Sequence, residues 1–114
     1  MATRSIDVVQ GTLDMLVLKA LSWKSMHGHA VLMWLREVTE SELQLDGAAL
    51  YPALHRLEER GLIDAEWGVS ENNRKAKFYA LTAQGRAALR TQADGWQQYV
   101  KLVARIMNAA EQRA

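Results

Sequence analysis

Apolar residues recur along most of the chain at the three- and four-residue spacings of amphipathic helices, and in two short stretches at the alternating spacing of strands. The first helical stripe begins after Gly11. We expect Thr12 to cap this helix, Asp14 to favour its positive end, and the helix to end near residues 23–26. A second helix is predicted over about residues 28–39. The side chains expected to point inward are Leu13, Leu16, Val17, Ala20 and Leu21 in the first helix and Ala30, Val31, Trp34, Leu35 and Val38 in the second.

A third helix is the stretch around which the rest of the chain is organised. Asp46 is its candidate N-cap, and Gly61 follows it as the residue expected in the left-handed conformation. Its apolar face consists of Leu50, Leu54 and Leu57, at i, i+4 and i+7. Its opposite face carries Tyr51, His55 and Arg56, so the helix pairs a core side with a side rich in hydrogen-bonding groups.

Two strands follow the third helix, over residues 62–68 and 75–81, and a polar turn joins them. Alternation places Ile63, Ala65 and Trp67 on one face of the first strand and Asp64 and Glu66 on the other. Three helices followed by a hairpin is the order of a winged helix. In that fold the third helix enters a DNA groove and the hairpin is the wing.

The last predicted helix, capped by Thr82 and running to about Asn108, carries a heptad seam. The seam residues, at spacings of 4, 3, 4, 3 and 4, are Leu89, Ala93, Trp96, Val100, Val103 and Met107, and Tyr99, Leu102 and Ile106 widen the stripe. Such a helix is about 38 Å long, which is more than one small domain can cover. We therefore expect the same helix of a second copy, related by a two-fold axis, to pack against it.

The expected fold is α+β and mostly α: a winged helix-turn-helix domain over residues 1–82 and a long C-terminal dimerisation helix over residues 83–114, in one compact unit. Residues 1–10 are expected to form an arm or a short helix. Residues 43–45 alternate and are expected to form a very short strand.

The cysteine count, the lack of long apolar runs and the net charge limit the classes of function that fit this sequence. The chain has 114 residues and no cysteine, so disulfides, thiolate zinc sites and cysteine nucleophiles are excluded. Neither a leader peptide nor a bilayer-spanning apolar run is present, which makes the cytoplasm the default compartment and argues against a membrane partner. The net charge of +1 is low for a nucleic-acid binder. Basic and acidic residues number four and five in residues 1–45, five and six in residues 46–82, and five and two in residues 83–114. A phosphate-binding surface must therefore come from local clustering or from the pairing of two chains.

Five blocks of sequence, in one register from Gly11 to Arg86, resemble the PadR family of bacterial transcriptional regulators. They are Gly11-Thr12-Leu13-Asp14 with Leu18, His27-Gly28-His29-Ala30, Leu50-Tyr51-Pro52-Ala53-Leu54-His55-Arg56-Leu57-Glu58, Gly61-Leu62-Ile63, and Asn72 to Leu81 followed by Leu81-Thr82 and Gly85-Arg86. The resemblance implies a winged helix-turn-helix homodimer that represses transcription until a small molecule or a stress signal releases it. The short chain with a single C-terminal helix resembles the compact subgroup. Members of that subgroup hold flat aromatic drugs at the dimer centre, between tryptophans on the last helix, and Trp96 stands where such a tryptophan would.

The candidate DNA contacts on the third helix are Ala49, Tyr51, Pro52, His55 and Arg56. The small residues among them let the backbone approach a base edge, or serve only the helix itself. The Tyr51 hydroxyl can donate to a phosphate, or the ring can pack at the domain edge. Arg56 can reach a phosphate or pair with Glu58 or Glu59, and His55 can contact DNA or make an interdomain hydrogen bond.

The hairpin holds the only dense basic cluster of the sequence. Its candidate DNA contacts are Asn73, Arg74, Lys75 and Lys77, with Asn72 beside them. A wing tip that lies along phosphates or enters a minor groove needs such residues. The alternative is a solvated hairpin without a partner.

Trp96 has two interpretations: a buried tryptophan of the dimer interface, or an aromatic platform for a planar aromatic or phenolic effector, with Gln92 and Asp94 as its hydrogen-bonding groups. The pair His27 and His29 suggests a metal, but without cysteines or a carboxylate pattern we expect a capping or surface role instead. No catalytic constellation and no cofactor-binding motif is found.

These observations favour a dimeric repressor that binds double-stranded operator DNA with palindromic half-sites. A winged helix used only for protein–protein contact remains the alternative, and the low net charge favours it. A small enzyme or ligand carrier built on the dimer pore is a third possibility, and the lack of acid–base groups on the seam argues against turnover.

Overall fold

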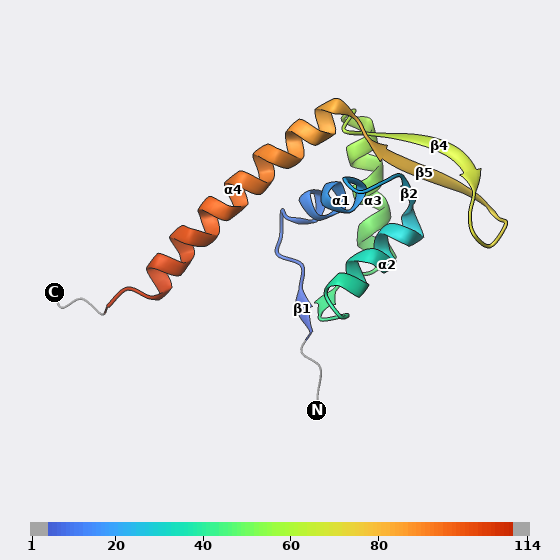
Figure 1. The fold of residues 1–114 in the computed structure, drawn as a ribbon. Coiled ribbons are helices and arrows are strands. Elements are labelled where there is room, and N and C mark those ends of the chain that lie inside the picture. Colours follow the sequence, from blue (N-terminus) through green and yellow to red (C-terminus); the bar gives the residue numbers. More distant parts are fainter. Residues whose placement is uncertain (1–4, 111–114) are drawn as a thin grey trace.

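The computed structural model describes residues 5–110, in which four helices and five strands follow one another in the predicted winged-helix order (Figure 1). The α+β fold, mostly helical and with a long C-terminal helix, is confirmed. The helices are α1 (Leu13–Leu21), α2 (Gly28–Val38), α3 (Gly47–Glu59) and α4 (Ala83–Met107). The strands are β1 (Ile6–Asp7), β2 (Met26–His27), β3 (Leu43–Gln44), β4 (Ile63–Val69) and β5 (Lys75–Leu81).

The predicted caps fix both ends of α3 and the start of α4. The Ala49 N–H donates to the Asp46 carboxylate at 3.1 Å, and Gly61 takes a φ of +74° after the helix. The Thr82 hydroxyl accepts from the Gly85 N–H at 3.0 Å and donates to the Gly61 carbonyl at 2.7 Å. One side chain thus joins the end of α3 to the beginning of α4.

The first turn of α4 lies against the chain that leaves α3. Gly85 is buried, and a Cβ placed on it would lie 2.0 Å from the Leu62 carbonyl oxygen. Glycine at this position lets α4 start close to the winged domain, which sets the direction in which the long helix leaves it (Figure 1).

The start of α1 differs from the prediction. The Thr12 hydroxyl donates to the Val9 carbonyl at 2.6 Å and makes no side-chain cap, because the Thr12 backbone is helical (φ −100°, ψ −13°) and not extended as at the caps Asp46 and Thr82. The helix ends at Leu21, before the predicted range, and Ser22 follows with its N–H bonded to the Lys19 carbonyl. Thr12 therefore marks the helix start without satisfying its free N–H groups through the side chain.

The described part of the N-terminal segment forms a strand, so the alternative of a short helix is wrong. Ile6 and Asp7 pair in parallel with Leu43 and Gln44, which are the predicted short strand. The rest of that segment, residues 1–4, lies outside the described residues. This pairing fixes the chain before α1 beside the chain before α3.

The core lies among α1, α2, α3 and the base of the hairpin. Its fully buried large side chains are Leu18, Leu21, Leu50, Leu54, Leu57, Ile63, Val17 and Val31. The inward stripe of α2 ends at Leu35, and Val38 is exposed rather than inward, because it is the last residue of the helix. Leu32, which the pattern did not place inward, is buried instead.

Candidate nucleic-acid interface

The outward side of α3 carries the residue types that the sequence predicted there. The exposed residues of its first three turns are Ala48, Ala49, Tyr51, Pro52, His55 and Arg56, whereas Leu50, Ala53, Leu54 and Leu57 are buried. Small side chains near the helix start, with polar groups one turn on, leave the backbone accessible to a flat, hydrogen-bonding partner such as a base-pair edge.

Tyr51 is packed on one side and exposed on the other. A Cβ added at Gly28, the first residue of α2, would lie 2.5 Å from Cε1 of the Tyr51 ring, and one added at Gly47 would lie 3.1 Å from its Cε2. The ring therefore occupies space that two glycines leave open between α2 and α3. Both interpretations of this residue fit: the ring holds the two helices, and its exposed edge faces outward.

Arg56 points toward α1. Its Nη2 donates to Oδ1 of Asp14 at 2.9 Å, and Nη1 of Arg60 lies 3.7 Å from Oδ2 of the same carboxylate. The pairing with Glu58 or Glu59 that the sequence suggested is therefore wrong, because a carboxylate 42 residues away in the chain is closer in space. Both arginines are more than half exposed, so this pair adds little stability but neutralises part of their charge.

Lys77 links the wing to α3. Its Nζ donates to Oε1 of Glu58 at 3.1 Å, and this hydrogen bond raises the pKa of the Lys77 ammonium. Lys77 shares its face of β5 with Tyr79, which is buried beside α3, and burial raises the pKa of the Tyr79 hydroxyl. Of the predicted wing cations, Lys77 is the one tied to the third helix, and it lies opposite Trp67 in the outer half of the hairpin.

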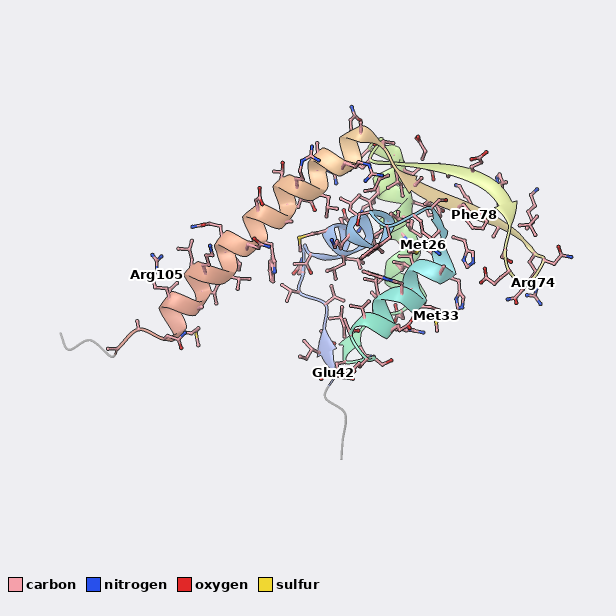
Figure 2. The ribbon with its side chains drawn as sticks, viewed as in Figure 1. Met26, Met33, Glu42, Arg74, Phe78 and Arg105 are labelled. Atoms are coloured by element: carbon pink, nitrogen blue, oxygen red, sulfur yellow. The ribbon has the colours of Figure 1, made fainter. Side chains whose placement is uncertain are left out.

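The tip of the wing has the predicted turn. Asn73 takes a φ of +59°, its N–H donates to the Ser70 carbonyl at 2.9 Å, and the Ser70 N–H donates to the Arg74 carbonyl at 2.8 Å. Figure 2 shows Arg74 at the far end of the hairpin, away from the helices. Arg74 and Lys75 are exposed, so their charges project beyond the body of the domain.

Trp67 shares its strand face with Ile63, as the sequence pattern predicted. It is 61% exposed and lies beyond the core, which the pattern did not indicate. The Lys75 ammonium sits 5.0 Å from the centroid of its ring. The length of the hairpin could have indicated the exposure of Trp67, because its seven-residue strands extend beyond a domain built on short helices.

His27 has the predicted capping role. Its Nδ1 accepts from the Ala30 N–H at 3.1 Å at the start of α2. Its Nε2 is buried without a hydrogen-bond partner among the described residues, and Oε1 of Glu71 lies 3.4 Å away. Within residues 5–110 no cluster of three or more His, Cys, Asp or Glu side chains could hold a metal ion.

A model of the PadR-like family of transcriptional regulators matches residues 17–91, which run from α1 through the wing into α4. The chain belongs to the PadR family. This result confirms the resemblance drawn from the five sequence blocks, and it makes the protein a transcriptional regulator by family.

Solved PadR structures share the fold. A PadR family regulator from Eggerthella lenta is 28% identical with a TM-score of 0.74, over 89% of this chain and 86% of that chain. One from Clostridium difficile is 25% identical with a TM-score of 0.73, over 86% and 100%. A protein of Lysinibacillus sphaericus, described as uncharacterized, is 27% identical over 105 residues, which are 92% of this chain and 96% of that protein.

The long helix of this PadR protein leaves its predicted seam largely uncovered (Figure 1). Leu89 and Ala93 are half-buried against the body, whereas Trp96 is 36% and Met107 75% exposed. The remaining seam residues, Val100 and Val103, are also exposed.

No helix within residues 5–110 is long and apolar enough to cross a bilayer.

A groove of about 300 Å³ lies where α4 passes the start of α1. Its lining consists of Gly11, Thr12, Met15, Gln92, Gly95, Trp96 and Tyr99. Two of the three predicted effector residues, Trp96 and Gln92, therefore meet in one groove. Asp94 is not part of its lining and is exposed elsewhere on the helix.

Proposed function

We propose that this PadR protein is a homodimeric repressor that binds a palindromic operator through α3 and the wing of each copy. A small molecule or stress signal acting at the dimer centre releases it. The observation that carries the proposal is the exposed apolar seam of α4. The seam begins against the winged domain, and no other element of residues 5–110 lies beside the C-terminal half of the helix (Figure 1).

The exposed seam supports pairing with a second copy. Trp96, Tyr99, Val100 and Ile106 are large apolar side chains within three turns of one helix, and contiguous apolar surface of this kind marks an interaction site. Each square ångström of apolar surface removed from water contributes roughly 25 cal/mol, so covering several such side chains offsets the cost of association. An isologous pairing of α4 with α4 covers both stripes at once.

The two α3 helices of such a dimer would lie in successive major grooves, about 34 Å apart, with the wings outside them. The exposed face of α3, from Ala48 to Arg56, supplies the groove contacts, and Arg74 and Lys75 supply charge on the wing. Arg56 and Lys77 already pair with the carboxylates of Asp14 and Glu58, which compete with phosphates for their charge.

The groove beside Trp96 supports the release step. Its lining joins an indole, a phenol ring from Tyr99 and the Gln92 amide, which suits a planar aromatic or phenolic molecule. The groove lies between α1 and α4. A ligand that binds more tightly to a dimer with one crossing angle of the α4 helices than to a dimer with another would change the distance between the two α3 helices.

Sedimentation equilibrium and binding to a labelled duplex from upstream of the gene test the proposal together. We expect the wild-type chain to be a dimer at micromolar concentration and its DNA affinity to fall steeply with salt. Val103→Glu on the seam should give a folded monomer that binds the duplex at least about tenfold more weakly, because two winged domains are no longer held in one molecule. Gln98→Glu, which adds the same charge off the seam, is the matched control. A wild-type monomer, or a monomeric Val103→Glu that binds as well as the control, would overturn the proposal.

A further inference from the structure

We propose that the wing meets DNA through one face of the hairpin, built by Trp67, Val69 and Lys75 and here called the tryptophan face. The Trp67 ring and Val69 pack on the sugar–phosphate wall of a groove while the Lys75 ammonium pairs with a phosphate. This inference rests on the proposed function and names the part of the wing that carries the contact.

The tryptophan face is apolar surface that the protein itself leaves uncovered. Along one face of β4 the exposed fraction rises from 1% at Ile63 to 61% at Trp67 and 65% at Val69, with Ala65 between them half-buried. The strand therefore starts in the core and continues past it. An indole and a valine held out on a rigid hairpin provide contact area at little cost in conformational entropy.

On the opposite face of the hairpin, the aromatic side chain packs against the protein itself. Phe78 lies over Gly68, where an added Cβ would meet the ring at 3.0 Å, and the same ring packs edge-on to His27 with 5.4 Å between centroids. The large apolar side chain of the opposite face is thus used for packing, whereas Trp67 and Val69 on the tryptophan face stay exposed.

The charges of the two faces identify that partner. Lys75 and Lys77 lie on the tryptophan face, as cross-strand partners of Val69 and Trp67. The acidic residues of β4, Asp64 and Glu66, point to the other side. A surface with two lysines and an aromatic ring, and no carboxylate from either strand of the wing, is complementary to a phosphate backbone.

The tryptophan face is also on the side of the hairpin that turns toward α3. Lys77 on this face reaches Glu58 of α3 at 3.1 Å, and Tyr79 on the same face is buried at the base of the hairpin. A duplex lying along the exposed side of α3 would therefore meet Trp67 and Lys75. Arg74, which lies at the far end of the hairpin in Figure 2, would extend the contact to the next phosphates.

Alanine replacement at two equally exposed tryptophans tests this assignment. In duplex binding at fixed salt we expect Trp67→Ala to lose roughly three- to tenfold in affinity and Trp67→Phe to retain most of it. Trp23→Ala is the matched control, because Trp23 is 68% exposed in the turn after α1, outside the wing. Urea unfolding of each variant checks that the exposed positions leave stability unchanged.

The salt dependence separates the roles of the two residues on this face. Trp67→Ala should leave the slope of log affinity against log salt unchanged, because an indole neutralises no phosphate. Lys75→Ala should reduce that slope by about one. Wild-type affinity in Trp67→Ala, or an equal loss in Trp23→Ala, would overturn this inference while leaving the proposed function intact. Failure of the wild-type chain to bind DNA at low salt would overturn the proposed function and this inference with it.

Discussion

The ammonium of Lys77 and the carboxylate of Glu58 lie 3.1 Å apart and join the wing to the third helix. The two residues are 19 positions apart in the chain and belong to the two elements that we propose contact DNA together. Their ion pair helps to fix the orientation of the hairpin relative to α3, and it also partly neutralises one of the positive charges of the wing.

Alkaline pH should weaken the fold through this region. The pKa of Lys77 is raised above its ordinary value of 10.5 by the hydrogen bond to Glu58, and burial raises the pKa of Tyr79 above 10.0. Both groups hold their protons more tightly in the folded state, so their contribution is complete below these ordinary values and is lost as the pH rises through the raised ones. The free energy of unfolding, measured in urea, should therefore fall above about pH 10.

Glu58→Gln should remove the contribution of Lys77 to the free energy of unfolding and so make its decline above about pH 10 less steep. Glu66→Gln on the opposite face of the wing is the charge-matched control and should keep the wild-type profile. Identical profiles for Glu58→Gln and the wild-type chain would show that the pair does not contribute in solution.

Removal of the Asp14 carboxylate should strengthen DNA binding. Asp14→Asn frees Arg56 and Arg60 from the carboxylate that they share, and surface ion pairs of this kind contribute at most about 1 kcal/mol to stability. We expect a rise of roughly two- to fivefold in affinity for duplexes of any sequence, because the freed charge acts on phosphates. Asp64→Asn is the control, because it removes one negative charge on the face of β4 opposite to Trp67. An equal gain in both variants would mean that Arg56 is not at the interface.

A side chain at Gly85 should destabilise the protein. The added methyl of Gly85→Ala would lie 2.0 Å from the Leu62 carbonyl oxygen, so backbone must move, at a cost of about 1–3 kcal/mol in urea unfolding. Ala87→Leu adds more bulk at an exposed position of the same turn and should stay within about 0.5 kcal/mol of the wild type. Equal stabilities for the two variants would contradict the close contact between α4 and the chain after α3.

Local signals predicted the helices and the hairpin well. Asp46, Gly61 and Thr82 act within a few residues of themselves, through hydrogen bonds to nearby N–H groups or through a backbone conformation that favours glycine. Their roles could therefore be read from spacing alone. The cap expected at Thr12 did not form because the Thr12 backbone is helical and not extended as at Asp46 and Thr82, which spacing alone does not reveal.

Other misses concern residues that are far apart in the chain. The partner of Arg56 is 42 residues away, and the parallel pairing of Ile6 with Leu43 joins two strands too short to leave a pattern. Alternation in β4 gave the face of Trp67 correctly but not the point at which the core ends. The DNA, dimer and effector roles assigned from the sequence stay predictions, supported by exposure on α3, the wing and α4.

The most direct test of the account is selection of binding sites from a random duplex library by the wild-type chain. The account predicts enriched sequences with an inverted repeat whose half-site centres lie about 10 base pairs, one helical turn, apart. It also predicts that moving the half-sites apart by about half a turn abolishes high-affinity binding, because α4 fixes the distance between the two α3 helices. Enrichment of a single unrepeated site, or equal affinity at both spacings, would contradict it.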